Sequence, residues 1–161
     1  MCKQVSIFSI ITLISSNLMA LELTTSIRIE ASPEVVWNIL TDFEAYPEWN
    51  PFIKKIEGEV AVGNKIKAKI TDMIFKPKIL AFDDMQKLEW IGRLGIPGFF
   101  DGRHYFILKD NGDGSTTLIH GEYFKGFLVP FLKKKLMVDT KAGFESMNQA
   151  LKARSEARIS A

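Results

Sequence analysis

Two histidines and one glutamate could do acid–base chemistry if the fold brings them together. His104 lies on an expected strand over residues 103–109, and His120 and Glu122 lie on the next expected strand, 115–124. Imidazole exchanges protons near neutral pH, and burial raises the pKa of a carboxylic acid while it lowers that of an imidazole. These three side chains are the candidates for a catalytic acid or base, or for polar contacts with a bound ligand.

A short turn sets the register between these two strands. Residues 110–114 read Asp-Asn-Gly-Asp-Gly, a composition that favours a tight hairpin turn. If Lys109 pairs with Ser115, His104 lies directly opposite His120, where side chains of neighbouring strands share a face. Apolar residues at alternate positions share that face, which indicates that it points inward. A register shift of one residue would turn the whole set outward.

Three interpretations of the His104, His120 and Glu122 cluster stay open. The cluster could orient a bound ligand, or it could be structural, either solvated on the outer face or hydrogen-bonded in the core. It could also be a catalytic acid–base set or a metal site of two histidines and one carboxylate. Substitution of His120 by alanine should then change ligand affinity if the cluster contacts the ligand.

Composition excludes several other classes of protein. The 161 residues fit one domain, and 47% hydrophobic with 25% charged residues predict a folded chain. The net charge of +2 is too balanced for a dedicated nucleic-acid binder, so no nucleic-acid partner is expected. Cys2 is the single cysteine and there are two histidines, which exclude an intrachain disulfide, a CxxC zinc site and a histidine-rich metal cage. Because no common nucleotide, hydrolase or zinc-protease motif is present, no cofactor is expected.

The first twenty residues differ from the rest of the chain. They carry one charge, Lys3, then an apolar stretch over residues 5–14, and they end at Ala20. This pattern predicts a signal peptide over residues 1–20, because a membrane span needs about 20 predominantly apolar residues. A buried strand or an amphipathic anchor is the alternative. With the signal peptide the protein would be periplasmic or secreted, and without it cytoplasmic.

Periodicity predicts the elements that position the candidate residues. Residues 21–31 alternate with a period of two, as in a half-buried strand, and Ser32-Pro33-Glu34 is typical of a helix start. That helix should run to about residue 42 and bury Val36, Trp37 and Leu40. Further strands are expected over 53–60, 65–71, 76–83 and 87–94, before the hairpin, and one long amphipathic helix over 130–158. A run of strands with one long helix predicts an α+β fold.

A proline–tryptophan segment carries a family resemblance. Residues 32–53, and above all Tyr46-Pro-Glu-Trp-Asn-Pro-Phe52, resemble the opening of the START-like (SRPBCC) superfamily, closest to its polyketide cyclase/dehydrase-like members. The element order and the Glu122-Tyr-Phe-Lys-Gly126 stretch match as well. The resemblance covers residues 21–158 as a single START-like ligand-binding domain. It implies a helix-grip (Bet v 1/START-like) fold, a curved antiparallel sheet of about seven strands around a long C-terminal helix, with two short helices.

Such a fold implies a deep cavity for a hydrophobic ligand between sheet and helix. Members bind lipids, sterols, polyketides, quinones or plant hormones, and a minority catalyse cyclisation or ring chemistry, so the fold alone implies no activity. The loop with Trp49 and Phe52 borders the cavity in the family. The predicted ligand-binding residues are apolar or aromatic, with the three polar candidates among them: Trp49, Phe52, Met73, Phe75, Trp90, His104, Phe106, His120, Glu122, Phe124, Phe127, Phe131, Met137, Phe144 and Met147.

These features favour a binding or carrier protein for a small hydrophobic ligand, lipid-like or aromatic. The alternative is a polyketide cyclase/dehydratase-like enzyme that uses His104, His120 or Glu122 as acid or base. A third possibility is a protein-interaction module. Lys133, Lys134 and Lys135 at the start of the long helix suggest contact with an anionic head group or a membrane surface, unless they are simply a solvated face.

Overall fold

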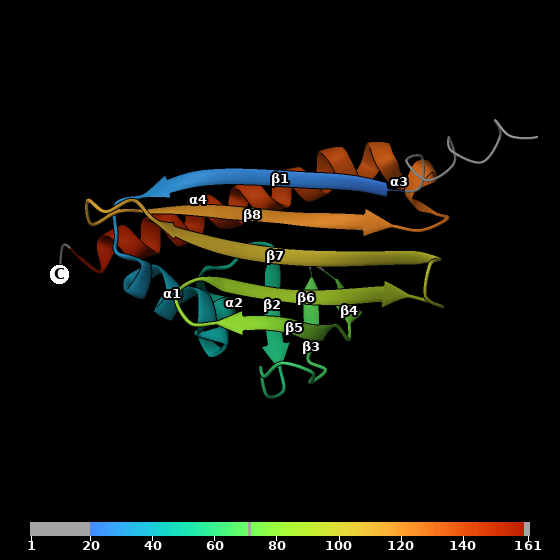
Figure 1. Cartoon of the computed structure of the whole chain (residues 1–161), viewed down its shortest axis with the longest axis horizontal. Coiled ribbons are helices and arrows are strands. Elements are labelled where there is room, and N and C mark those ends of the chain that lie inside the picture. The colour runs from blue at the N-terminus through green and yellow to red at the C-terminus, as the bar shows by residue number, and fades with distance from the viewer. Residues whose placement is uncertain (1–19, 71, 160–161) are drawn as a thin grey trace, which may run out of the picture.

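The chain folds into two antiparallel sheets with one long helical segment across them (Figure 1). The computed structural model describes residues 20–70 and 72–159. A five-stranded sheet has the order β1-β8-β7-β6-β5, and a three-stranded sheet has the order β2-β3-β4. The strands are β1 (Ala20–Ile29), β2 (Ile53–Glu57), β3 (Lys67–Ile70), β4 (Met73–Phe75), β5 (Lys78–Asp83), β6 (Lys87–Leu94), β7 (Phe100–Asp110) and β8 (Thr116–Lys125).

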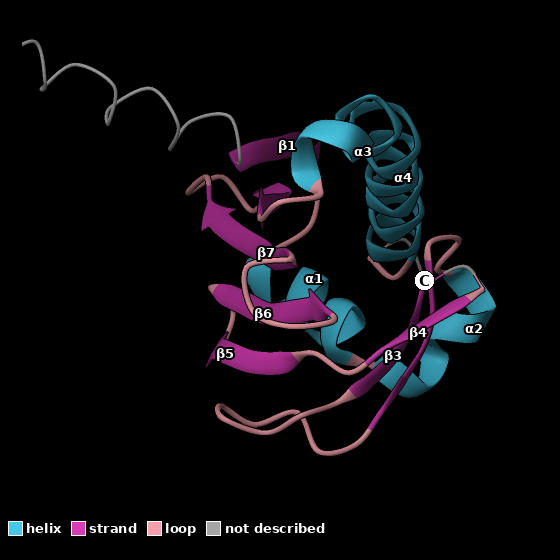
Figure 2. Cartoon of the chain, turned by 90° about the vertical axis from the view of Figure 1, so that its right-hand side faces the viewer, coloured by secondary structure: helices cyan, strands magenta, loops and turns pink. Residues whose placement is uncertain are grey.

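Helices close the space between the two sheets. Figure 2 shows the small sheet at an angle to the large one, with α4 along the open side. Two elements of one or two turns follow α1 in the chain, and two others precede α4. The helices are α1 (Pro33–Thr41), η1 (Phe43–Ala45), α2 (Tyr46–Trp49), α3 (Val129–Lys135), the π-helical segment η2 (Leu136–Thr140) and α4 (Lys141–Ala157).

Helix α1 begins where its sequence predicts. The Ser32 hydroxyl accepts a hydrogen bond from the backbone N–H of Val35, and Pro33 occupies the first turn, where no backbone donor is needed. Its buried face includes Val36, Trp37 and Leu40, as predicted. These side chains belong to the larger apolar cluster, which fills the α1 end of the molecule.

The long C-terminal helix is interrupted. The predicted single helix over 130–158 is divided into α3, η2 and α4, with the π-helical segment between two α-helical ones. Phe144, Met147 and Leu151 of α4 are buried against the sheet at helical spacing. Val129 and Phe144 form a smaller apolar cluster with Leu23 and Phe124.

The register of the β7–β8 hairpin differs from the predicted one by two residues. Lys109 pairs with Thr117, not with Ser115, so His104 lies opposite Glu122. The loop is wider because Asp113 accepts hydrogen bonds from both the backbone N–H and the hydroxyl of Ser115. A shift of two residues keeps every side chain on its face, so the candidate residues still point inward.

The predicted α+β helix-grip fold is confirmed, with two differences in detail. Eight strands in two sheets replace the expected single sheet of about seven, because β4 was not predicted and β2 to β4 pair only with one another as a sheet. The predicted signal peptide lies outside the described residues except for Ala20, which begins β1. Within the described part of the chain, no helix is long and apolar enough to cross a membrane.

Candidate functional site

The two histidines lie in a cluster of aromatic rings between the large sheet and α4. The Trp90 and His104 rings are stacked at a centroid distance of 4.9 Å and an interplanar angle of 2°. On the other side, the Phe144 ring lies 4.0 Å from the His120 ring, and Phe106 lies 4.4 Å from it. All five side chains are buried. The rings of the protein therefore fill the space beside both imidazoles.

A continuous chain of hydrogen bonds runs through this cluster, which we call the polar chain. Glu122 Oε2 lies 3.3 Å from His104 Nδ1, and His104 Nε2 lies 3.0 Å from His120 Nε2. His120 Nδ1 then lies 2.8 Å from Asn148 Oδ1, and Asn148 Nδ2 lies 2.9 Å from Thr25 Oγ1. The Thr25 hydroxyl returns to the backbone carbonyl of His120 at 2.9 Å. The chain thus links β7, β8, α4 and β1.

The buried end of the polar chain fixes the direction of its hydrogen bonds. The single hydroxyl proton of Thr25 goes to the carbonyl oxygen of His120, so the Thr25 oxygen accepts from the Asn148 amide. The amide oxygen of Asn148 consequently faces His120, and it can only accept. His120 Nδ1 must therefore carry a proton and donate it.

The donor and acceptor roles of His120 also determine those of His104 and Glu122. In neutral His120 the Nε2 atom has no proton, so His104 Nε2 donates to it. Neutral His104 then presents an unprotonated Nδ1 toward Glu122. A hydrogen bond at this point requires the proton to come from Glu122, so the carboxyl group is in its neutral acid form.

Burial shifts the pKa values in the direction that this hydrogen-bond pattern needs. It lowers the pKa of His104 to about 3 and raises the pKa of Glu122 to about 8. The pKa of His120 also lies well below its ordinary value, first because of burial and then because of the nearby His104, although its hydrogen bond to Asn148 acts in the opposite direction. At neutral pH the cluster therefore holds two uncharged imidazoles and one protonated carboxyl.

Glu122 forms one end of the polar chain, and its side chain reaches solvent. Its side chain is 18% exposed, whereas both imidazoles are buried. Its Oε1 atom lies over Gly102, where an added Cβ would collide with it. No hydrogen-bond partner for Oε1 exists among residues 20–70 and 72–159. One acceptor of the polar chain is thus free to bind a ligand.

The inner face of the large sheet is covered over β1 and β8, but it is less covered at the far end of β6. Along β6, Leu88 and Trp90 are buried, while Leu94 on the same face is 51% exposed. On the neighbouring strand, Phe100 is only half-buried. Glu122 therefore lies where the closed, apolar part of the interior gives way to the open part.

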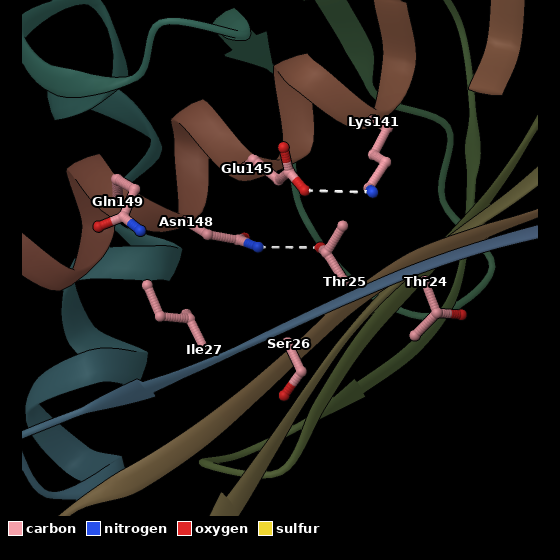
Figure 3. A pocket seen from close by; sticks show the side chains of 8 residues that line it. All are labelled: Thr24, Thr25, Ser26, Ile27, Lys141, Glu145, Asn148 and Gln149. Carbon is pink, nitrogen blue, oxygen red and sulfur yellow. Dashed lines mark hydrogen bonds and ion pairs between the residues drawn. The ribbon is translucent and has the colours of Figure 1, made fainter. Parts of the chain in front are cut away.

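Two hollows in the described part of the structure lie away from the predicted cavity. One hollow of about 460 Å3 lies between β1 and α4, lined by Thr24, Thr25, Ser26, Ile27, Lys141, Glu145, Asn148 and Gln149 (Figure 3). It is mainly polar and backs onto Thr25 and Asn148 of the polar chain. Another, of about 140 Å3, lies on the exposed face of the small sheet at Lys55, Glu57, Lys67, Lys69 and Ile74. Where a deep cavity was expected beside the imidazoles, the Phe144 and Trp90 rings pack against them in the described part of the chain.

Several other predicted ligand-binding residues lie around the cluster or near its open end. Phe52 is half-buried, with its ring 5.5 Å from that of Phe144. Trp49 is half-buried against Tyr46, and its indole N–H is buried without a hydrogen-bond partner among the described residues. Phe75 is half-buried as well, whereas Phe124 and Met147 belong to the buried core.

Four other predicted ligand-binding residues lie on the surface of this structure. Met73, Phe127, Phe131 and Met137 are all exposed, Phe131 by 74%. Met73 belongs to the short edge strand β4, and Phe131 and Met137 lie on α3 and η2. Periodicity places a residue on the inward face of an element, but it does not reveal that the facing element ends earlier. These side chains do not line an enclosed space.

Two residues of the polar chain were missed by the sequence analysis. Thr25 lies between Leu23 and Ile27 on the inward face of β1, so period two was sufficient to find it. Asn148 lies four residues after Phe144 on the buried face of α4. A polar residue on an otherwise apolar face signals a buried hydrogen-bond partner, and this was the available clue.

The alternative interpretation as a metal site is not supported. Among the residues that the structure describes, no group of three or more His, Cys, Asp or Glu side chains could hold a metal ion. The two imidazoles direct their Nε2 atoms at each other, and at 3.0 Å these atoms are hydrogen-bonded partners.

The family of the chain follows from its sequence, and the solved structures agree with the fold. Residues 20–156 match the profile of the family described as polyketide cyclase / dehydrase and lipid transport. A search of curated proteins finds no match.

Three solved structures illustrate the similarity of the fold. A START superfamily protein from Mycobacterium smegmatis is 24% identical, with a TM-score of 0.64 over 84% of this chain and 97% of that one. The Zhui aromatase/cyclase from a Streptomyces species is 15% identical, with a TM-score of 0.66 over 87% and 96%. Norcoclaurine synthase from Thalictrum flavum, captured with a transition-state analogue, is 13% identical, with a TM-score of 0.68 over 87% and 96%. The chain therefore belongs to the polyketide cyclase/dehydrase and lipid transport family and has a START-like fold.

Proposed function

We propose that the protein binds a small, largely apolar molecule whose hydroxyl group donates a hydrogen bond to Glu122. The observation that carries this proposal is the Oε1 atom of Glu122, which has no hydrogen-bond partner among the described residues and lies at an end of the polar chain that reaches solvent, beyond the aromatic rings around the imidazoles. A polar atom placed beside apolar surface is the usual arrangement of a ligand site, because the polar contact orients a molecule that apolar burial holds.

The hydrogen-bond pattern selects the kind of polar group on the ligand. The proton of Glu122 is directed at His104, so the remaining oxygen can only accept. A phenol, a sterol or another alcohol supplies the required donor, whereas an ether or an ester does not. A donor–acceptor match of this kind is worth about 1 kcal/mol, or roughly a fivefold to tenfold preference.

The apolar part of the ligand would lie on the uncovered part of the sheet. Leu94 and Phe100 lie on that inward face beyond Glu122, and both retain exposed apolar surface. Covering such surface contributes about 25 cal/mol per Å2, before the cost of association is subtracted. Lipid transport is among the activities in the family description, which agrees with a ligand of this class.

A second candidate function, cyclase- or dehydratase-like catalysis, is favoured by one specific observation. Burial raises the pKa of Glu122 to about 8, close to neutral pH, where a group can serve as acid or base. In the fraction of molecules in which Glu122 is ionised, its Oε1 atom could accept a proton from a bound ligand. The Zhui aromatase/cyclase shares the fold of this chain, at 15% identity.

Calorimetric titration with two matched probes tests the binding proposal. We expect 2-naphthol, which has a hydroxyl group, to bind about tenfold more tightly than 2-methoxynaphthalene, which does not. In Glu122→Leu the two affinities should become equal. Equal affinities in the wild-type protein, or an unchanged preference in Glu122→Leu, would overturn the proposal.

Glu122→Gln separates binding from catalysis. The glutamine amide can donate to His104 Nδ1 and its oxygen can still accept, so it imitates the neutral acid but cannot transfer a proton. A carrier should keep its 2-naphthol affinity in this variant. Native mass spectrometry of the gently purified protein would identify a bound molecule, and turnover of that molecule by the wild-type protein but not by Glu122→Gln would instead establish acid–base catalysis.

A further inference from the structure

Exposed apolar side chains gather at one end of the molecule, where the β6–β7 turn meets the start of α3. Ile96 and Phe99 lie in the turn, and Phe127 and Phe131 lie just before and within α3. All four are exposed, although each is large and hydrophobic. We call these four residues the apolar tip. Soluble proteins rarely expose such groups together without a partner.

Hydrogen bonds hold the two halves of the apolar tip together. The backbone N–H of Phe127 donates to Gly98 at 3.1 Å, and that of Leu128 donates to Phe99 at 3.1 Å. The Phe127 and Phe131 rings lie 5.7 Å apart. The exposed side chains therefore belong to one structured surface, and not to unrelated loops.

Unpaired positive charge surrounds the apolar tip. Lys133, Lys134 and Lys135 are exposed, and Lys134 and Lys135 follow Phe131 by three and four residues, so they share its side of the helix. Lys125 lies two residues before Phe127 and is exposed too. None of these lysines forms an ion pair with another residue in the described part of the chain. The tip is thus apolar at its centre and basic at its rim.

The N-terminal part of the chain joins the domain at the same end. Ala20 is the first residue of β1 and pairs with Lys125 of β8 (Figure 1). The apolar stretch over residues 5–14 precedes it in the sequence.

We propose that the apolar tip docks on the surface of a bilayer that contains anionic phospholipids. Phe127, Phe131 and Ile96 would enter the interfacial region, and the lysines would contact phosphate groups. The exposed apolar side chains match the acyl region of such a bilayer, and the lysines match its anionic head groups. A second copy of the chain fits less well, because its own lysines would face these lysines at a symmetric contact. This docking is independent of the ligand proposed for Glu122.

Vesicle flotation of the full chain tests the docking. We expect binding to phosphatidylglycerol-containing vesicles and at least about tenfold weaker binding to phosphatidylcholine vesicles. Phe127→Ser/Phe131→Ser and Lys134→Glu/Lys135→Glu should each lower partitioning into the anionic vesicles by about tenfold or more. Added salt should weaken the binding of the wild-type protein.

Two matched controls keep the test specific to the apolar tip. Lys109→Glu/Arg158→Glu changes the net charge by the same amount, from +2 to −2, at the opposite end of the molecule, and Val62→Ser removes an exposed apolar side chain elsewhere. Both should bind vesicles like the wild-type protein. Wild-type binding by both tip variants would overturn the proposal, because the N-terminal segment alone would then account for it. A lipid-free dimer that Phe127→Ser/Phe131→Ser abolishes would also overturn it, in favour of self-association.

Discussion

The two ends of the large sheet use the same kinds of residue in opposite ways. At the α1 end, Leu88, Leu108 and Leu118 are buried beneath α1 and α4. At the other end, Leu94, Phe127 and Phe131 remain exposed. Glu122 and its hydrogen-bonded histidines lie between these regions. The difference shows that apolar side chains form a core only where a second element covers the face of the sheet on which they lie. The apolar side chains that stay exposed are available to contact a ligand or a partner.

Matched phenylalanine substitutions should show this difference most strongly. Phe106 is fully buried among the rings of the cluster, while Phe131 is 74% exposed. We expect Phe106→Ala to lower the free energy of unfolding by roughly 3–5 kcal/mol, and Phe131→Ala to change it by less than about 0.5 kcal/mol. Urea denaturation measures both. Similar losses in the two variants would show that the two ends do not differ in this way.

Substitution of Asn148 should disrupt the polar chain, which lies between the two ends of the large sheet. Asn148→Leu leaves the His120 Nδ1–H group without its acceptor and removes the amide that donates to the Thr25 oxygen, at a cost of about 2 kcal/mol. It also releases the constraint that fixes the proton positions on His120 and His104. Nitrogen NMR of the imidazoles should show a proton on Nδ1 of His120 and Nε2 of His104 in the wild-type protein, and mixed forms in the variant. An Nε2-protonated His120 in the wild-type protein would contradict the direction of the polar chain.

The pH dependence of stability should change sign near pH 6.5. Burial lowers the pKa of both histidines below the ordinary value of 6.5, so the unfolded state binds more protons below that pH and stability is lost as pH falls. The raised pKa of Glu122, about 8 against 4.5, has the opposite effect, and stability is lost as pH rises from 4.5 to 8. Between pH 4.5 and 6.5 the effect of the two histidines on the free energy of unfolding is larger than that of the one glutamate, so stability rises with pH in this range and falls above it.

The Glu122→Gln variant isolates the contribution of Glu122 to the pH dependence of stability. Between pH 6.5 and 8 the wild-type protein should lose about 1 kcal/mol per pH unit relative to this variant. Thermal unfolding in matched buffers measures the difference. A constant difference across this range would mean that Glu122 is already ionised in the folded protein.

Alanine substitutions at two paired glycines should give the smallest difference in stability and in ligand affinity. Gly102 pairs with Gly92 across β6 and β7, but only at Gly102 would a Cβ collide with the Glu122 carboxyl group. We expect Gly102→Ala to cost about 1 kcal/mol and to weaken 2-naphthol binding, and Gly92→Ala to change both little. Chemical denaturation and calorimetry give the two readouts. Equal 2-naphthol affinities in both variants would show that the carboxyl position does not matter for binding.

The sequence predicted most of the fold because local signals agree with it. The Ser32 cap, the alternation in β1 and the helical stripe with Phe144 and Leu151 all reflect short-range periodicity. The candidate cluster was also predicted from the alternation of side chains along the strands. A register error of two residues leaves each side chain on the same face, so this prediction did not depend on the exact register. The register itself depended on how Asp113 widens the loop, a detail that turn composition does not encode.

The uncovered end could not be predicted from these signals. Phe131 and Met147 were both expected to line the cavity, yet one is on the surface and the other is in the core. The outcome depends on where the facing sheet ends and on the helical interruption at η2, which are tertiary properties. The filling of the expected cavity by the Phe144 ring is likewise a result of packing, which residue type alone does not determine.

Difference infrared spectroscopy of Glu122 tests the central claim most directly. The wild-type protein minus Glu122→Gln at pH 6.5 should show the carbonyl band of a protonated carboxylic acid, and this band should disappear as the pH rises through about 8. A carboxylate signal at pH 6.5 would contradict the account, because an ionised Glu122 cannot donate the proton that the orientation of His104, His120 and Asn148 requires.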